Sequence, residues 1–403
     1  MRSWPVPTVE AAPVALRAGR RVIIAAEPAE VVCASGPDAL AALDRLTPGW
    51  WAGYLSHDLG RIIEPFAPRR ADDLGLPDVL LARYEARAVL GPRGPRLEGR
   101  RRARDRLASL LAAAPPAGPV ASVGPGRSSL DRHAYEAGVQ SILELIQAGD
   151  CYQVNLTRRL TWAGAADPLA FGAALRAANP APHESLLVLP RRSGSPVGVV
   201  SASPERYLAW RGSRVETRPI KGTGTCGTSL TASTKDHAEN VMIVDLARND
   251  LGRCCEFGSV RVSELCTVEE HPGLCHLVST VCARRRLDVG PSELIRATFP
   301  PASVTGAPKP RVLQIIEDLE PCRRGVYCGA VGWIDTERDE GDLAVGIRTF
   351  TLTDDQTHLG TGAGIVADSD PGQEWEETEL KVARLTSIIP GLEPSTVLDP
   401  SRR

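Results

Sequence analysis

Strand-like segments follow one another in groups along this chain, and that order constrains its fold more than any other feature. The apolar runs of strand length are 152–162, 186–189, 197–200, 207–210, 327–334, 343–352 and 358–365. Strands that succeed one another without a helix between them pair antiparallel, whereas doubly wound folds alternate strands with helices. We therefore predict an α+β fold of mixed, largely antiparallel sheets with helices outside them.

Helical spacing of apolar residues marks other long segments. Asp131 can cap a helix in which Tyr135, Val139 and Ile142 follow this spacing, and Gly149 would end it. The other helical patterns cover 235–251, 292–298, 310–319 and 373–386. These helices are expected on the outside of the sheets.

One stretch suggests how the chain is divided. Residues 112–129 are rich in proline, glycine and serine, which is typical of a linker. They would join an N-terminal portion, 1–111, to the rest of the chain, 130–393. With 403 residues, the chain can form one large or two medium domains.

Composition excludes several classes of partner and location. The 47 basic and 49 acidic residues nearly balance, so we expect neither nucleic acid nor a membrane surface as partner. No segment resembles a signal peptide or a membrane span, which predicts a cytoplasmic protein. The ten cysteines are irregularly spaced without a CxxC pair, so we expect reduced thiols rather than a disulfide scaffold.

Two acidic pairs, Asp236/Glu239 and Glu374/Glu377, lie in predicted helices. Residues three apart share a helix face, so each pair presents two carboxylates side by side. Two such faces across a cleft would form an oxygen-rich cage of the kind that Mg²⁺ prefers when it also holds a substrate anion. Acidic pairs on helices more often face solvent, so the neighbouring motifs must decide between these interpretations.

Lysine 221 stands between a rigid proline and a flexible glycine, in the segment Pro219-Ile220-Lys221-Gly222. Glycine permits a sharp backbone turn and the close approach of a ligand. If water were excluded around it, the Lys221 amine would be a candidate nucleophile. A surface lysine in a turn is the alternative.

Glycine-rich and cationic residues supply anion-binding groups. The segment 303–309 predicts a loop that enters a helix, and helix starts bind anions. A second glycine-rich segment, 360–364, lacks the GxGxxG spacing and does not indicate a dinucleotide site. Arg348, expected in a strand, and Lys381, on the same helix face as Glu377, are cationic partners for carboxylates.

Ordered motifs over 131–392 resemble the chorismate-utilising enzymes, which comprise anthranilate and aminodeoxychorismate synthase large subunits, isochorismate synthases and salicylate synthases. The motifs that carry the resemblance are GDCYQVNL, SASPERYL, RPIKGT, KDHAENVMIVDLARNDLGR, FPPASVTGAPK, AVGIRTF and GAGIVADSDPGQEWEETELK. The PIKGT form, with Lys221, resembles the aminodeoxychorismate synthase branch of the family, whereas anthranilate synthases carry alanine at the lysine position. Gln153 agrees with an amine-transferring enzyme, because the branches that activate water carry a lysine at that position.

The resemblance implies two facing antiparallel sheets with the active site in the cleft between them. It implies roles for the following residues: Glu239 and Glu377 as direct Mg²⁺ ligands, Asp236 and Glu374 as ligands through water, Arg348, Tyr327, Lys381 and the amide of Gly362 or Gly364 as carboxylate-binding groups, Thr305 and His276 as lining of the substrate ring, and Glu205 as general acid.

The implied reaction is amination of chorismate at C4, for para-aminobenzoate and folate. Lys221 would attack C2 and expel the 4-hydroxyl, and ammonia would then add at C4 and expel the lysine. No segment carries the GxCxG elbow and distant HxE of a glutaminase, so a separate glutamine amidotransferase subunit is expected to supply the ammonia.

Two alternatives remain open at this point. An anthranilate synthase large subunit would aminate a different ring carbon and release pyruvate. A non-catalytic, chorismate-binding pseudo-subunit is suggested by two departures from the family pattern near the expected cleft. Relatives usually carry an arginine soon after the PIKGT threonine, where this chain has Gly224-Thr225-Cys226. They usually carry glycines where this chain has Pro301-Ala302.

Overall fold

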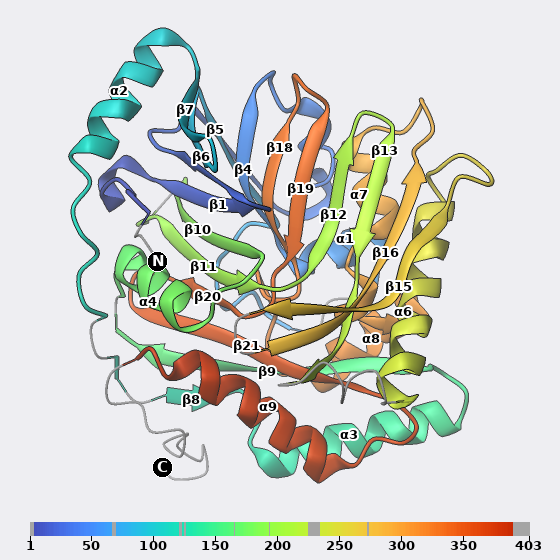
Figure 1. Cartoon of the computed structure of the whole chain (residues 1–403). Coiled ribbons are helices and arrows are strands. Elements are labelled where there is room, and N and C mark those ends of the chain that lie inside the picture. Colours follow the sequence, from blue (N-terminus) through green and yellow to red (C-terminus); the bar gives the residue numbers. More distant parts are fainter. Residues whose placement is uncertain are drawn as a thin grey trace.

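Two large antiparallel sheets face each other, with helices outside them (Figure 1). The computed structural model describes residues 4–66, 70–120, 123–124, 126–164, 166–192, 194–224, 234–271 and 274–389. Every pairing between the described strands is antiparallel. The predicted α+β class is confirmed.

The first sheet contains the first and the last of the described strands, β1 and β21, and combines segments from across the chain. In order, its strands are β17 (Gly306–Ala307), β9 (Gln153–Ala163), β21 (Gln356–Ile365), β20 (Thr349–Leu352), β11 (Val197–Ser203), β10 (His183–Leu189), β1 (Val14–Ala18), β2 (Arg21–Ala25), β6 (Ala86–Gly91) and β7 (Gly94–Gly99), with β8 (Gly126–Ser128) paired to β9.

The second sheet is built in the same way from early and late segments. In order, its strands are β14 (Ile220–Gly224), β16 (Leu274–Arg284), β13 (Arg214–Arg218), β12 (Arg206–Arg211), β19 (Glu340–Val345), β18 (Ala330–Asp335), β4 (Trp50–Leu55), β5 (Val79–Tyr84) and β3 (Glu30–Ala34), with β15 (Arg261–His271) paired to β16. Residues 1–111 therefore contribute strands to both sheets, and 112–129 contain β8.

Helices cover the outer faces of both sheets (Figure 1). They are α1 (Gly60–Ile63), α2 (Arg101–Ala112), α3 (Arg132–Gln147), α4 (Pro168–Ala178), α6 (Thr234–Gly252), α7 (Pro291–Thr298), α8 (Lys309–Leu319) and α9 (Pro371–Thr386). The predicted helices at 235–251, 292–298, 310–319 and 373–386 match α6, α7, α8 and α9. No helix in the described part of the chain is long and apolar enough to cross a bilayer.

Helix α3 illustrates how local sequence determines an element that positions the site. The Asp131 carboxylate accepts a hydrogen bond from the Ala134 N–H at 2.8 Å and caps the helix, as predicted. Tyr135, Val139 and Ile142 are fully buried, in a cluster with apolar residues of β9, β21 and α8. Burial of side chains of this size contributes roughly 1.5–3 kcal/mol each, which fixes the helix against the end of the sheet.

Three larger apolar clusters fill most of the rest of the described structure. One lies between the sheets and includes Leu16, Tyr54 and Leu187. The second packs α2, α4 and α9 on the outer face of the first sheet, and the third packs α6 and α7 on the second sheet. The sheets are therefore buried on both faces over much of their extent, and residues of one strand alternate between clusters.

One predicted strand is wrong. The expected strand 343–352 is two strands in different sheets, because β19 ends at Val345 and β20 begins at Thr349. Arg348 lies in the crossover with φ of 51°, not in a strand. The apolar pattern continues through the crossover, so periodicity alone could not locate it. Gly346 permits the crossover, because a side chain there would lie 2.3 Å from the Val326 carbonyl oxygen.

The cysteines agree with the prediction of reduced thiols. Nine cysteines within the described residues are free. Cys226 lies outside those residues.

Candidate active site

The predicted site residues come from both sheets and from helices α6 and α9. Gln153 lies on β9 and Lys221 on β14, while Gly362 and Gly364 lie on β21. Glu205 lies between β11 and β12, at a second place where the chain changes sheet. The fold therefore brings these distant segments to the region where the two sheets meet.

Lys221 marks the centre of this region. Its Nζ lies 3.4 Å from Oε2 of Glu239 on α6, and the two side chains are only 15% and 16% exposed. A Cβ added to Gly364 would lie 3.1 Å from this Nζ and 2.5 Å from Nε2 of Gln153. Side chains from α6, β9 and β14 therefore lie close together beside Gly364 of β21. A side chain at position 364 would collide with Gln153 and crowd Lys221.

Gln153 carries the clearest sign that this region binds something. Both its Nε2 and Oε1 atoms are buried, and neither has a hydrogen-bond partner within the described structure. Leaving a buried polar group unsatisfied costs roughly 1–3 kcal/mol. Such groups are rare in folded proteins, and a ligand that exchanges hydrogen bonds with the amide would remove the cost.

Glu205 can hold a proton close to neutral pH. The residue is 4% exposed, and burial raises the pKa of its carboxyl from 4.5 to about 7. The Ser303 hydroxyl, the Lys221 charge and the Ile220 N–H act in the opposite direction. A carboxyl with this pKa is suited to general acid catalysis near neutrality, and the influence of Lys221 places it in the same region.

Arg348 offers a cation that has no partner among the described residues. Burial lowers the pKa of its guanidinium to about 10, which still leaves it charged at neutral pH. Within the part of the chain that the structure describes, its side chain makes no hydrogen bond or ion pair. Its backbone is fixed, because the Arg348 carbonyl accepts a hydrogen bond from the Ala202 N–H at 3.0 Å. A half-buried guanidinium of this kind is typical of a carboxylate-binding site.

Lys381 joins α9 to the same strand. Its Nζ donates to the Gly362 carbonyl at 2.9 Å and lies 2.6 Å from Oε1 of Glu377, one helical turn away. Gly362 and Gly364 are two residues, about 7 Å, apart on β21. The pairs Lys221–Glu239 and Lys381–Glu377 therefore both reach the same short segment of β21.

The other member of the α9 acidic pair is held differently. Glu374 is 5% exposed, and its Oε1 accepts a hydrogen bond from the Ser369 hydroxyl at 2.6 Å. The Asp236 side chain lies outside the described residues, although its backbone belongs to α6.

The remaining predicted residues line the surroundings. Thr305 is fully buried, and its hydroxyl donates to the Pro301 carbonyl at 2.9 Å. His276 is buried on β16, in register with Thr223 of β14. The Tyr327 ring lies against Gly360, where a Cβ would come within 2.1 Å of it, and burial raises the pKa of its phenol well above the usual value. Tyr327 precedes β18 rather than starting it.

The carboxylates fit a divalent cation by their chemistry. Glu239, Glu374 and Glu377 supply the hard oxygen ligands that Mg²⁺ prefers. Lysine ammonium groups lie 3.4 Å from Glu239 and 2.6 Å from Glu377, so a bound Mg²⁺ would have to replace these contacts. Among the residues that the structure describes, no three His, Cys, Asp or Glu side chains form a ready-made metal cluster.

The sequence reasoning missed one residue that supports the site. Arg324 is buried and donates to the carbonyls of Asn155 at 2.6 Å and Val304 at 2.8 Å, while pairing with Glu320. It thereby ties β9 to the segment that carries Thr305. Its carbonyl acceptor on β9 is 169 residues away in the sequence, so no local pattern could have indicated this role.

The facing sheets thus bring together a buried carboxyl of raised pKa, Glu205, and a guanidinium, Arg348, that has no partner among the described residues. The family described as chorismate binding enzyme matches residues 10–387, and this chain belongs to that family. The resemblance found in the sequence is thus confirmed.

Relatives within the family include more than one activity. The chain is 38% identical over 346 residues to aminodeoxychorismate synthase component 1 of Klebsiella aerogenes, covering 83% of this chain and 75% of that protein. It is 36% identical over 373 residues to anthranilate synthase component 1 1 of Haloarcula marismortui, covering 84% and 75%.

Solved structures agree on the fold. Anthranilate synthase component I from Streptococcus pneumoniae TIGR4 superposes with a TM-score of 0.78 at 27% identity, covering 92% of each chain. The menaquinone-specific isochorismate synthase of Escherichia coli superposes with a TM-score of 0.76 at 18% identity, covering 96% of this chain and 90% of that one. The predicted arrangement of two facing sheets is therefore confirmed.

Proposed function

We propose that this chain is the catalytic component of an aminodeoxychorismate synthase, which aminates chorismate at C4. The observation that carries the proposal is the position of Lys221, whose amine lies beside Glu239 and above Gly364. The burial of Lys221, and the nearby Gln153 amide that no described residue satisfies, support a role for this lysine on bound substrate rather than in a surface turn.

The first displacement would form a bond between Lys221 Nζ and ring carbon C2. Both ring double bonds move by one position, and the bond between C4 and its hydroxyl breaks. Hydroxide is a poor leaving group, so Glu205 gives its proton to the departing oxygen and water leaves. The pKa of about 7 for Glu205 supports this role.

The second displacement would reverse the first. Ammonia adds at C4, the double bonds return to their original positions, and the bond from C2 to Lys221 breaks. Lys221 leaves as the neutral amine, and the new C4 ammonium gives one proton to the Glu205 carboxylate, which restores the acid. The sum is chorismate plus ammonia giving 4-amino-4-deoxychorismate plus water. Pyruvate is retained.

Substrate binding would use the cations around β21. Arg348 and Lys381 would hold the carboxylates, together with Tyr327 and the amide of Gly362 or Gly364. Thr305, His276 and Gln153 would line the ring, and the unsatisfied amide of Gln153 supports its contact with substrate.

A magnesium ion belongs to the same proposal. Glu239 and Glu377 would hold it, with Asp236 and Glu374 supporting through water. When bound, the ion would neutralise the ring carboxylate and withdraw electrons from the conjugated ring. The carboxylate oxygens of Glu239, Glu374 and Glu377 support the proposal, since Mg²⁺ prefers hard oxygen ligands.

The ammonia would come from a separate glutamine amidotransferase subunit. This sequence contains no GxCxG elbow with a distant HxE motif. The name component 1 of the Klebsiella relative implies a partner subunit for that protein, which supports the same arrangement here. The product would serve para-aminobenzoate and folate synthesis.

A second candidate is the anthranilate synthase reaction, because relatives of that name are nearly as similar. One experiment separates the two. The purified chain is incubated with chorismate, Mg²⁺ and ammonium, and products are identified by mass spectrometry before and after addition of a lyase that removes pyruvate from 4-amino-4-deoxychorismate. We expect para-aminobenzoate only after the lyase, whereas direct formation of anthranilate would refute the proposal.

A further inference from the structure

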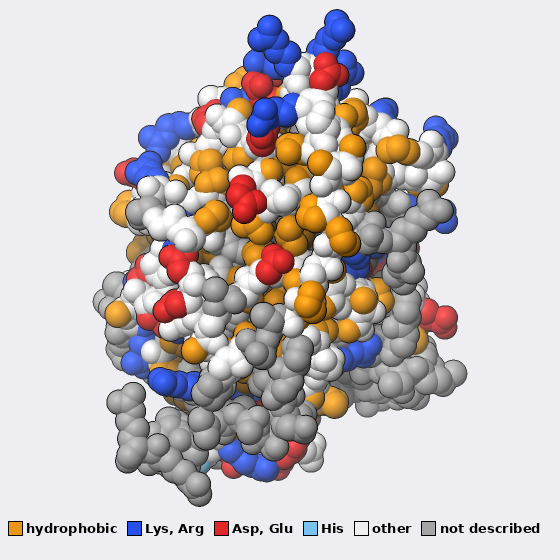
Figure 2. Space-filling view, turned by 90° about the vertical axis from the view of Figure 1, so that its left-hand side faces the viewer, with side chains coloured by type: hydrophobic (Ala, Val, Ile, Leu, Met, Phe, Trp, Pro, Cys, Tyr) orange, Lys and Arg blue, Asp and Glu red, His pale blue; other side chains and the backbone are white. Residues whose placement is uncertain are grey.

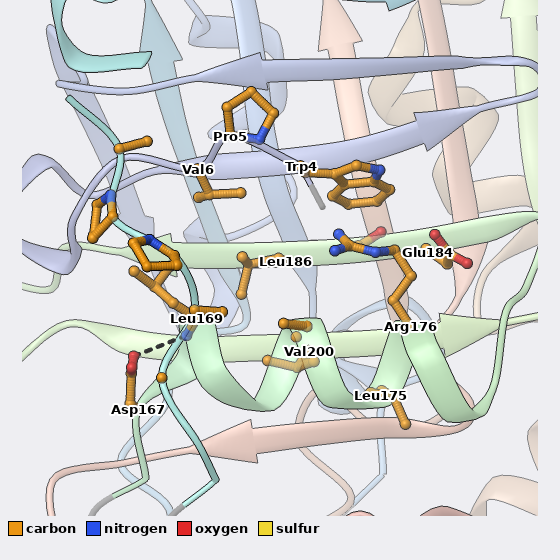
Figure 3. Close-up of a pocket in the computed structure, with 18 of the residues that line it drawn as sticks. Trp4, Pro5, Val6, Asp167, Leu169, Leu175, Arg176, Glu184, Leu186 and Val200 are labelled. Atoms are coloured by element: carbon orange, nitrogen blue, oxygen red, sulfur yellow. Dashed lines mark hydrogen bonds between the residues drawn. The ribbon is translucent and has the colours of Figure 1, made fainter. Parts of the chain in front are cut away.

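A pocket of about 360 Å³ lies on the outer face of the first sheet, apart from the candidate active site (Figure 3). Its walls come from α4, from strands β10 and β11, from the N-terminal residues 4–6 and from 114–118. Residues 4–6 and 114–118 therefore enclose, together with α4, a space of ligand size.

Arg176, in the last turn of α4, is the cation of this pocket. The ring of Trp4 lies over its guanidinium, with 4.4 Å between the guanidinium carbon and the ring centroid. The side chain is half-buried, and burial lowers the pKa of the group, although a guanidinium stays charged in proteins. Figure 3 shows Trp4 and Arg176 stacked at one end of the pocket.

The neighbouring charges do not neutralise Arg176 by direct contact. Glu184 accepts hydrogen bonds from Arg17 at 2.9 and 3.1 Å through one oxygen, and from the Ala181 N–H at 3.0 Å through the other. Arg176 itself makes no hydrogen bond or ion pair with any described residue. Its donors are therefore available to an anion inside the pocket, where partial removal of water strengthens such a bond.

Most of the other residues that line the pocket are apolar, although Ser185 and Ser201 also border it. Side chains of Val6, Leu169, Leu186 and Val200 face its interior, and 115–116 add two prolines. Hydrophobic side chains also gather across the middle of this side of the molecule (Figure 2). The ligand should therefore have an apolar body as well as a negative charge.

The charge of the ligand is limited by the acids that share the lining. Asp167 and Glu184 both border the pocket. Asp167 caps α4 through a hydrogen bond from the Leu169 N–H at 2.9 Å. Among the described lining residues, two carboxylates lie near one available guanidinium, which disfavours a dianion such as a phosphate monoester, whereas Arg176 can match one carboxylate.

We propose that this pocket binds a small organic monocarboxylate with an aromatic or branched aliphatic body. Its carboxylate pairs with Arg176 beneath Trp4, and its body lies against Leu186 and Val200. The site is independent of the proposed amination chemistry. It shares β11 with the candidate active site, since this strand leads directly to Glu205.

The test compares acids with their amides, which match in shape and lack the charge. Benzoate, phenylacetate and 3-methylbutanoate are titrated against benzamide, phenylacetamide and 3-methylbutanamide by isothermal titration calorimetry. We expect at least one acid to bind about tenfold more tightly than its amide. If no acid binds better than its amide at millimolar concentration, the proposal is overturned.

Variants locate the binding. Arg176→Met should remove the preference for the acid, Trp4→Ala should weaken binding, and the control Arg192→Met should leave it unchanged, because Arg192 is exposed and does not line the pocket. Thermal unfolding checks that each variant is folded, and Arg176→Gln replaces Arg176→Met if that variant is not. Unchanged binding in a folded Arg176 variant would refute the assignment.

Discussion

Lys221 Nζ lies 3.4 Å from the Glu239 carboxylate, and the two residues come from a strand and a helix on opposite sides of the undescribed segment 225–233. The pair joins two proposed functions, since Lys221 is the candidate nucleophile and Glu239 a candidate metal ligand. An ammonium has no lone pair and cannot attack carbon. The ion pair therefore describes how the lysine is held before reaction, and proton loss must precede its attack.

Replacing Lys221 tests its role as nucleophile. Lys221→Ala should reduce amination at C4 by roughly 100-fold, which corresponds to about 2.7 kcal/mol of lost transition-state stabilisation. Residual chemistry should shift towards C2 and an anthranilate-like product. Rates and products are followed by chromatography with mass detection. Lys221→Arg is the matched control, because it keeps the charge beside Glu239 but not the nucleophile. Normal activity in the arginine variant would show that only the charge matters.

Neutralising the acidic pairs tests the metal site. Glu239→Gln and Glu377→Gln should each abolish activity and leave the fold intact, because an amide is a much weaker ligand for Mg²⁺. Glu376→Gln is the control, since this residue lies on the same helix but pairs with Arg132. Activity is measured with added Mg²⁺ and after chelation. Full turnover in excess EDTA would contradict the assignment.

The pH dependence of stability tests the environment of Glu205. Its carboxyl has a pKa of about 7 in the folded chain against 4.5 normally, so the folded state holds the proton more tightly. The cost of ionising it is absent below pH 4.5, grows between pH 4.5 and 7, and is constant above. Glu205→Gln should therefore raise the free energy of unfolding by on the order of 1–3 kcal/mol at pH 8 and leave it unchanged at pH 4.

The same substitution should lower the activity, although it raises the stability at pH 8. Glu205→Gln removes the proton donor, so we expect a loss of about 100-fold or more. In the wild type, kcat/KM should fall as pH rises through about 7, as Glu205 loses its proton. Urea unfolding at both pH values and a pH–rate profile are the measurements. A flat profile between pH 6 and 9 would exclude Glu205 as the acid.

Adding a methyl group at position 364 tests the close approach of Gln153 and Lys221 to β21. In Gly364→Ala, the new methyl group would lie 2.5 Å from Gln153 Nε2 and 3.1 Å from Lys221 Nζ. We expect KM for chorismate to rise by roughly tenfold, since both side chains must move, with little change in thermal stability. Gly252→Ala is the control, because a Cβ there meets nothing within 4 Å. Equal kinetics in the two variants would argue against a substrate site at Gly364.

The ammonia source can be tested with the purified chain. Free ammonia is scarce near neutral pH, so a physiological aminating enzyme needs a supplier. The chain alone should turn over chorismate with high ammonium but not with glutamine. Brisk glutamine-dependent activity from this polypeptide by itself would refute the need for a partner.

Some features could be predicted from the sequence because their causes are local. Asp131 and the apolar residues that follow it encode the cap and the buried face of α3, since both depend on residues within a few turns. The spacing of Glu374, Glu377 and Lys381 likewise placed one acid–lysine pair on a single helix face. Ordered motifs identified the family, which the comparisons confirm.

Other features exist only because the chain folds back on itself. Sheet pairing and the packing of the two sheets bring β9, β14 and β21 together, so that Lys221 and Gln153 lie beside Gly364 and no described residue satisfies the Gln153 amide. The crossover at Arg348 was missed, since strand periodicity continues through a change of sheet. Local patterns report the preferences of neighbouring residues, whereas burial, charge pairing and unsatisfied hydrogen bonds depend on contacts between distant segments. The sequence alone therefore determined the family and the helices, and the tertiary structure decided which side chains meet.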